Sequence, residues 1–143
     1  MKHYTTIEQS KKLVELGLSP DTADMFYSRR PTGKSEYSVF PDFKPEGRLE
    51  VFTKVDLPCW SLGALIELMP KIISVPVDER SAYFYSLEWQ FANDNSLRYI
   101  ATNRGKCLID IYSDHDTRGK SLIETAFEMV CWLLENGYIK KEK

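Results

Sequence analysis

Acidic side chains and one histidine gather in the stretch DIYSDHD of the C-terminal half. The stretch contains Asp110, Asp114, His115 and Asp116. Carboxylate oxygens are the ligands that hard divalent cations prefer, and a histidine can serve as a general base. The alternative is a polar connection before a helix, where acidic residues are favoured by the helix dipole. We favour the connection, because the other histidine is His3 and no second carboxylate cluster marks a partner site.

Two Gly-Lys-Ser triplets raise the question of nucleotide binding, and one of them follows the apolar run 107–112. A phosphate-binding loop needs a Gly or Ala five residues before its last glycine, so that backbone N–H groups can wrap the phosphates. Counting back from Gly119 gives Asp114, and counting back from Gly33 gives Ser28. Asp114 would also place a negative charge beside a polyphosphate. We therefore expect no nucleotide at either loop.

The three cysteines are Cys59, Cys107 and Cys131, and no two of them form a CxxC pair. An odd number of widely spaced cysteines in apolar segments is typical of reduced thiols in a cytoplasmic protein. No histidine or Gly-rich turn stands beside any of them to activate a nucleophile. We expect buried, inert thiols, and neither a disulfide, a zinc site nor a cofactor.

Length and composition indicate a globular chain without a preference for polyanions. A chain of 143 residues is the size of one domain, so we expect a single domain over residues 1–143. The net charge is −2, which gives no electrostatic reason to expect nucleic acid or an anionic membrane as a partner. Residues 1–12 lack the apolar run of a signal peptide, and no segment approaches the roughly 20 apolar residues of a membrane span. We expect a soluble cytoplasmic protein.

Capping residues predict two helices near the N-terminus. The first begins after Thr5 or Thr6, with an acid or amide in capping-box position three residues later, and ends at Gly17. The second is short and covers SPDTADMFY, with a serine as its N-cap and a proline at its first position. Apolar positions in the first segment recur at helical spacing, which predicts one buried side.

The middle of the chain predicts a long connection, a strand and a helix. Residues 28–47 are rich in Pro, Gly, Ser and charge, with a short strand expected at 37–40. Alternating apolar residues predict a strand over 48–55. The following helix has Ser61 as its expected N-cap and Pro70 as its stop.

The last 60 residues predict three antiparallel strands and a helix. Period-two patterns cover 83–91, 97–102 and 107–112, with short turns between them. An amphipathic helix follows, with Ser121 and Glu124 spaced as a capping box and a C-terminal glycine in ENGY. We therefore predict an α+β fold, in which N-terminal helices are followed by an antiparallel β-meander packed against a C-terminal amphipathic helix.

Aromatic residues share one face of the predicted meander. They are Tyr83, Tyr85, Trp89, Phe91 and Tyr99. Some proteins stack the bases of single-stranded nucleic acid on such a face, with basic residues around it. The last helix also needs a face to cover, and few basic residues lie nearby. We therefore favour core packing and keep single-stranded nucleic-acid binding as an alternative.

Two tryptophans and a basic pair are candidates for a contact surface. Trp132 lies toward the charged side of the last helix, and Trp60 precedes a helix cap. Exposed tryptophan and arginine are enriched at binding hot spots, so Trp132, Arg29 and Arg30 are the candidate contacts. The alternative is that each tryptophan covers the edge of the core, and we favour this alternative.

The run LPCWSLGALIELMP, the meander and the ending ETAFEMVCWLLENGYI together resemble short proteins of unknown function that are encoded in bacterial prophages and other mobile elements. The resemblance covers roughly residues 55–139. It implies a genomic setting and carries over no catalytic residue.

The sequence as a whole favours an interaction protein over an enzyme. We expect a small cytoplasmic protein that binds a protein partner or a second copy of itself, with nucleic acid an unfavoured partner and no membrane or nucleotide involved. A metal-dependent enzyme using the 110–116 loop and a single-strand nucleic-acid binder remain the alternatives.

Overall fold

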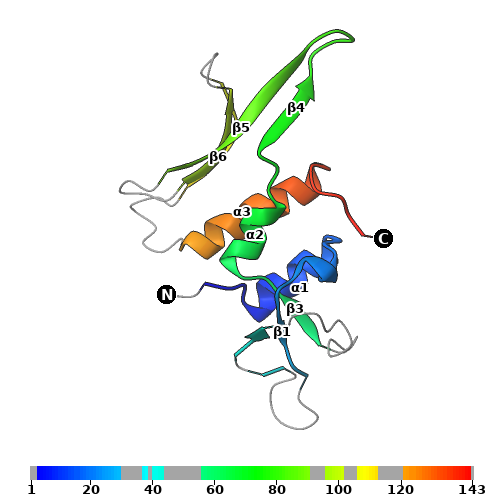
Figure 1. Ribbon diagram of the computed structural model, residues 1–143, viewed down its shortest axis with the longest axis vertical. Coiled ribbons are helices and arrows are strands. Elements are labelled where there is room, and N and C mark those ends of the chain that lie inside the picture. The colour runs from blue at the N-terminus through cyan, green and yellow to red at the C-terminus, as the bar shows by residue number, and fades with distance from the viewer. Residues whose placement is uncertain are drawn as a thin grey trace.

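The computed structural model describes residues 3–29, 37–38, 40–43, 56–90, 96–101, 106–112 and 121–142. Within them, three helices lie between a small antiparallel sheet at one end and a larger antiparallel sheet at the other (Figure 1). The last helix packs against the larger sheet. The predicted α+β class, with a meander against a C-terminal helix, is confirmed.

Helix α1, Ile7–Glu15, begins at the predicted capping box. The Thr6 hydroxyl accepts a hydrogen bond from the backbone N–H of Gln9 at 3.1 Å, and the Thr6 N–H donates to the Gln9 side chain at 3.0 Å. At the other end Gly17 has a φ of +96°. The N–H of Leu18 bonds to the carbonyl of Leu13 at 3.0 Å, which completes a Schellman termination.

The predicted second helix is one turn long. A 3₁₀ turn, η1, covers Pro20–Thr22, and the chain then leaves helical geometry at Ala23. Met25–Tyr27, predicted as helix, form strand β1 instead. The reason is tertiary, because Met25 and Tyr27 point together into a small core while β1 pairs with a strand about 30 residues later.

The small sheet has the order β2-β1-β3, with β2 at Asp42–Phe43 and β3 at Leu57–Cys59. Its buried side chains form a cluster of their own, made of Met25, Tyr27, Leu57 and Cys59. Of the predicted 37–40 strand, residues 37, 38 and 40 are described, and among them Tyr37 forms an isolated bridge with Arg29. The strand predicted over 48–55 lies outside the described residues.

The larger sheet is a four-stranded meander in the order β4-β5-β6-β7. The strands are β4 Ile72–Pro76, β5 Ala82–Gln90, β6 Ser96–Ala101 and β7 Lys106–Tyr112. The period-two patterns predict β5, β6 and β7, whereas no strand is predicted between Pro70 and β5. Pro76 lies at the last position of an edge strand, where a proline costs little pairing.

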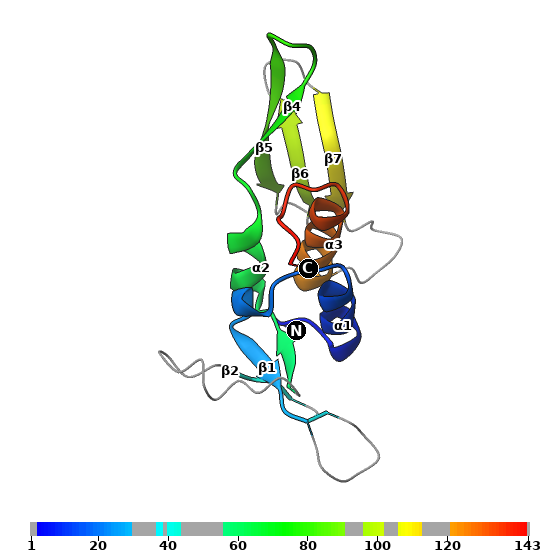
Figure 2. The same ribbon diagram turned by 90° about the vertical axis from the view of Figure 1, so that its right-hand side faces the viewer.

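Helices α2, Leu62–Leu68, and α3, Leu122–Glu135, begin at the predicted serines. Ser61 accepts from the N–H of Ala64 at 3.2 Å, and Ser121 accepts from that of Glu124 at 3.4 Å. Gly137, with a φ of +78°, follows α3 as predicted. Figure 2 shows α3 beside α2 and against the ends of β6 and β7.

The main core lies between the three helices and one face of the larger sheet. It contains Leu13, Trp60, Leu65, Tyr99 and most of the inward side of α3. The two clusters meet at consecutive residues, because Cys59 belongs to the small core and Trp60 to the main core. Both side chains are fully buried. The favoured prediction placed Trp60 at the edge of the core, and the structure buries it completely within the main core.

Candidate interaction surface

The predicted metal residues are placed only in part. Asp110 is exposed on β7 and lies opposite Arg98 of β6. Asp114, His115 and Asp116 lie outside the described residues. Across the described ranges, no group of three or more His, Cys, Asp or Glu side chains could hold a metal ion. Asp110 raises the pKa of Arg98, after the larger effect of the hydrogen bond to Glu88, so this carboxylate already faces a cation.

The predicted contact residues belong to different parts of the fold. Trp132 in α3 is half-buried, and its ring stacks on Tyr138 with centroids 5.5 Å apart. Arg29 is exposed after β1 in the small sheet, where its N–H donates to Asp56 at 3.3 Å. Arg30 lies outside the described residues. Figure 1 shows α3 and β1 in separate parts of the molecule, so Trp132 and Arg29 come from separate surfaces.

The described members of the predicted aromatic set contact the main core, where α3 covers the sheet; they are Tyr83, Tyr85, Trp89 and Tyr99. Tyr85 is 7% exposed and Tyr99 is fully buried, with its hydroxyl donating to the Pro70 carbonyl at 2.7 Å. Tyr83 and Trp89 are half-buried, and Phe91 lies outside the described residues. Buried rings have no free face for a base, so the favoured prediction of core packing is confirmed for Tyr85 and Tyr99.

The expectation of buried thiols is correct for one cysteine and wrong for another. Cys59 is fully buried, and burial raises its pKa above the usual value. Cys131 is half-buried, and burial raises its pKa to about 12. Cys107 is exposed, because it points to the outer face of the sheet, away from α3. The ladder has a register shift at this point, so Cys107 lies opposite Ile100 on the outer face whereas Ile109 lies opposite the buried Tyr99.

Strand register defines the outer face of the larger sheet. Ser86 of β5 lies between Ile72 of β4 and Ile100 of β6, because directly paired residues point to the same side. Phe84 precedes Ser86 by two positions and therefore shares this side. Ile72 is 59% exposed and Phe84 63% exposed. We call Ile72, Phe84, Ser86 and Ile100 the outer patch.

A row of charges borders the outer patch. Glu88, Arg98 and Asp110 are paired across β5, β6 and β7. The Arg98 guanidinium donates to Glu88 at 2.7 Å. The row holds two acids and one base, so its formal charge is −1. An apolar patch with a polar border is the usual composition of a protein interface.

The outer patch could not be predicted from the sequence, because its residues come from strands whose pairing is not a local property. In the sequence, Phe84 shares its alternate positions in β5 with the polar residues Ser86 and Glu88, which is the one local indication of an apolar outer face. Ile72 lies in β4, for which the sequence predicts no strand. Only the pairing of β4 with β5 brings these two side chains to one face.

No protein-family model, curated protein or solved structure matches the chain. Among the described residues, none of the helices has both the length and the apolar character needed to cross a membrane.

Proposed function

We propose that the chain is a small cytoplasmic interaction protein that binds a protein partner through the outer patch. The observation that carries this proposal is the exposure of Ile72 and Phe84 as diagonal neighbours on a face that no described helix covers. Contiguous exposed apolar side chains on a rigid element are typical of binding surfaces. A mobile-element setting belongs to the same proposal and rests on the sequence resemblance alone.

The charges around the outer patch favour a protein over a nucleic acid. The adjacent row is acidic by one charge, and the whole chain carries −2. A nucleic-acid surface needs an excess of positive charge for phosphate contacts. The aromatic rings that could stack with bases lie mostly on the opposite, covered face. These observations support an apolar protein surface as the partner.

The test is a pull-down that compares three forms of the tagged protein in nuclease-treated bacterial lysate. The first is the unaltered chain, and the second carries Ile72→Ser with Phe84→Ser. The third carries Phe40→Ser, a matched control, because Phe40 is 72% exposed outside the outer patch. We expect a protein that is recovered with the first and third forms and lost with the second.

Sedimentation of the purified forms separates a second copy from a foreign partner. A self-associating chain would sediment as a larger species than the double variant at the same concentration. Equal recovery of all proteins by the three forms, together with equal sedimentation, contradicts the proposal. Recovery that requires omission of the nuclease would instead support the nucleic-acid alternative. Unfolding curves confirm that each variant is folded.

A further inference from the structure

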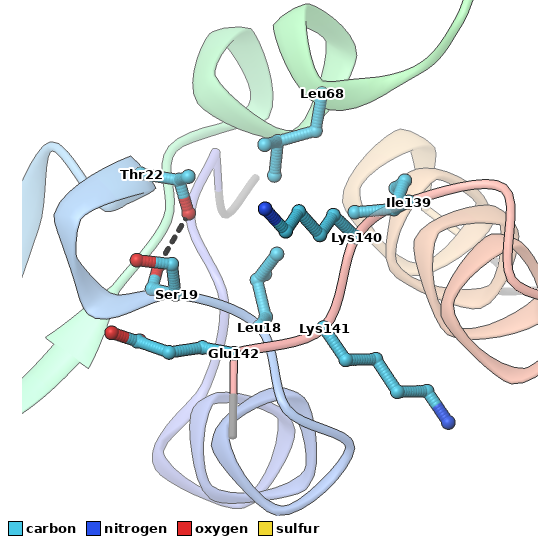
Figure 3. A pocket seen from close by; sticks show the side chains of 8 residues that line it. All are labelled: Leu18, Ser19, Thr22, Leu68, Ile139, Lys140, Lys141 and Glu142. Atoms are coloured by element: carbon cyan, nitrogen blue, oxygen red, sulfur yellow. Dashed lines mark hydrogen bonds between the residues drawn. The ribbon is translucent and has the colours of Figure 1, made fainter.

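A pocket of about 420 Å³ opens between the 3₁₀ turn, α2 and the C-terminal segment. Leu18, Leu68 and Ile139 supply its apolar side (Figure 3). Its volume lies within the range of sites that hold small molecules, and such sites pair apolar walls with a few placed polar groups. The pocket is on a different part of the fold from the outer patch.

The C-terminal wall of this pocket is fixed by a close backbone contact. The N–H of Glu142 donates to the carbonyl of Gly17 at 2.6 Å. A Cβ on Gly17 would lie 3.1 Å from the Cβ of Lys141 and 3.2 Å from the Glu142 carbonyl oxygen. Only a glycine lets the segment pass this closely at a φ of +96°. The backbone of this wall is therefore anchored to the turn that ends α1.

The two lysines of this wall point in different directions. Figure 3 shows the Lys140 ammonium over the pocket, between Leu68 and Leu18, and the Lys141 ammonium directed away from it. Glu142 also points away from Lys140, toward the side of Ser19. Within the described part of the chain, the structure records no ion pair for Lys140. The pocket thus combines an apolar side with one available positive charge.

We propose that this pocket binds a small amphipathic anion, namely an aliphatic carboxylate. The hydrocarbon chain lies against Leu18, Leu68 and Ile139, and the carboxylate faces the ammonium of Lys140. Apolar contact supplies most of the affinity, because each methylene group that leaves water contributes favourably to the free energy of binding. The charge of Lys140 selects the anion over a neutral or cationic molecule of the same length.

Titration of the ¹⁵N-labelled protein with octanoate tests the proposal. We expect amide shifts that concentrate at the pocket residues and saturate. Octylamine, which has the same chain and the opposite charge, should give weaker binding. Lys140→Gln should weaken octanoate binding about three- to five-fold, the size expected for one exposed ion pair. Lys141→Gln is the matched control and should leave the affinity unchanged.

Three results would overturn the proposal. They are shifts that never saturate or that spread over the whole chain, equal effects of Lys140→Gln and Lys141→Gln, and octylamine binding as tight as octanoate. The Ile72→Ser and Phe84→Ser double variant should retain octanoate binding, because the outer patch lies elsewhere. Failure of this pocket is therefore distinguishable from failure of the outer patch.

Discussion

The indole N–H of Trp60 donates a hydrogen bond to the hydroxyl of Thr22 at 2.9 Å, although 38 residues separate them in the chain. Trp60 is fully buried, so this bond satisfies a donor that has no access to water. The same hydroxyl donates to the carbonyl of Ser19 at 2.6 Å. Thr22 therefore ties the residue before α2 to the 3₁₀ turn.

Thr22→Val should destabilise the fold by leaving the indole N–H of Trp60 without a partner. The expected loss is about 1–3 kcal/mol in the free energy of unfolding, the cost of an unsatisfied buried polar group. Thr22→Ser keeps the hydroxyl and should cost clearly less. Urea unfolding followed by tryptophan fluorescence measures both. Equal losses for the two variants would show that the hydroxyl is not what matters.

Gly17→Ala and Gly63→Ala should shift stability in opposite directions. At Gly17 an alanine meets the C-terminal segment at 3.1 Å in a left-handed backbone conformation, which costs about 1–2 kcal/mol. Gly63 lies in α2, where the nearest heavy atom to a new Cβ is 3.8 Å away. Alanine there should add about 0.5–1 kcal/mol. Thermal unfolding measures the pair, and destabilisation of similar size at both sites would contradict this account.

Tyr99 should make the fold sensitive to alkaline pH. Burial raises its pKa well above the usual 10.0, so the folded chain keeps the phenol neutral. The unfolded chain loses this proton near pH 10, which favours unfolding as the pH rises further. The contribution is fully present below pH 10 and falls by at most about 1.4 kcal/mol per pH unit above it. Urea midpoints between pH 8 and 11 should fall more steeply for the unaltered chain than for Tyr99→Phe. Parallel profiles would refute the assignment.

Alkylation of the native protein should modify Cys107 first, Cys131 slowly and Cys59 only on unfolding. Cys107 is exposed, Cys131 is half-buried and Cys59 is buried. The pKa of Cys107 is raised by partial desolvation and then by Asp110, so its rate should still be climbing above pH 9.

Asp110→Asn removes one cause of this raised pKa and should accelerate alkylation of Cys107 at pH 8. Glu67→Gln in α2 is the control, because it changes the net charge by the same amount at a site away from the meander. Mass spectrometry of digests assigns each modified thiol. An unchanged rate in Asp110→Asn, or first labelling at Cys131, would contradict the placement of Cys107 on the outer face.

Helix ends could be predicted because they are decided locally. The hydroxyls of Thr6, Ser61 and Ser121 bond to N–H groups three residues away, and Gly137 adopts its positive φ beside the helix that it ends. The inward aromatic face of β5 followed equally from period-two alternation. These features depend on interactions between residues that are close in the chain. Such local interactions can be inferred from a single sequence.

Strands β1 and β4 could not be predicted, because distant partners decide them. Met25–Tyr27 become a strand by pairing with Leu57–Cys59, and Ile72–Pro76 by pairing with β5. Both binding candidates arise in the same way. The outer patch needs β4 in register, and the pocket needs Ile139 beside Leu18, about 120 residues earlier. Local sequence patterns contain no information on which distant segments of the chain come into contact.

The peptide bond between Cys59 and Trp60 connects the small core to the main core and couples their unfolding. Thr5 bonds to both sides of this junction, since its N–H donates to the Trp60 carbonyl at 2.9 Å and its hydroxyl accepts from the Trp60 N–H at 3.1 Å. Opening of the small sheet therefore weakens the hydrogen bonds that hold Trp60, which is the largest side chain in the main core. The amide proton of Trp60 is held by the Thr5 hydroxyl, so its hydrogen exchange reports how strongly the small core is coupled to the main core.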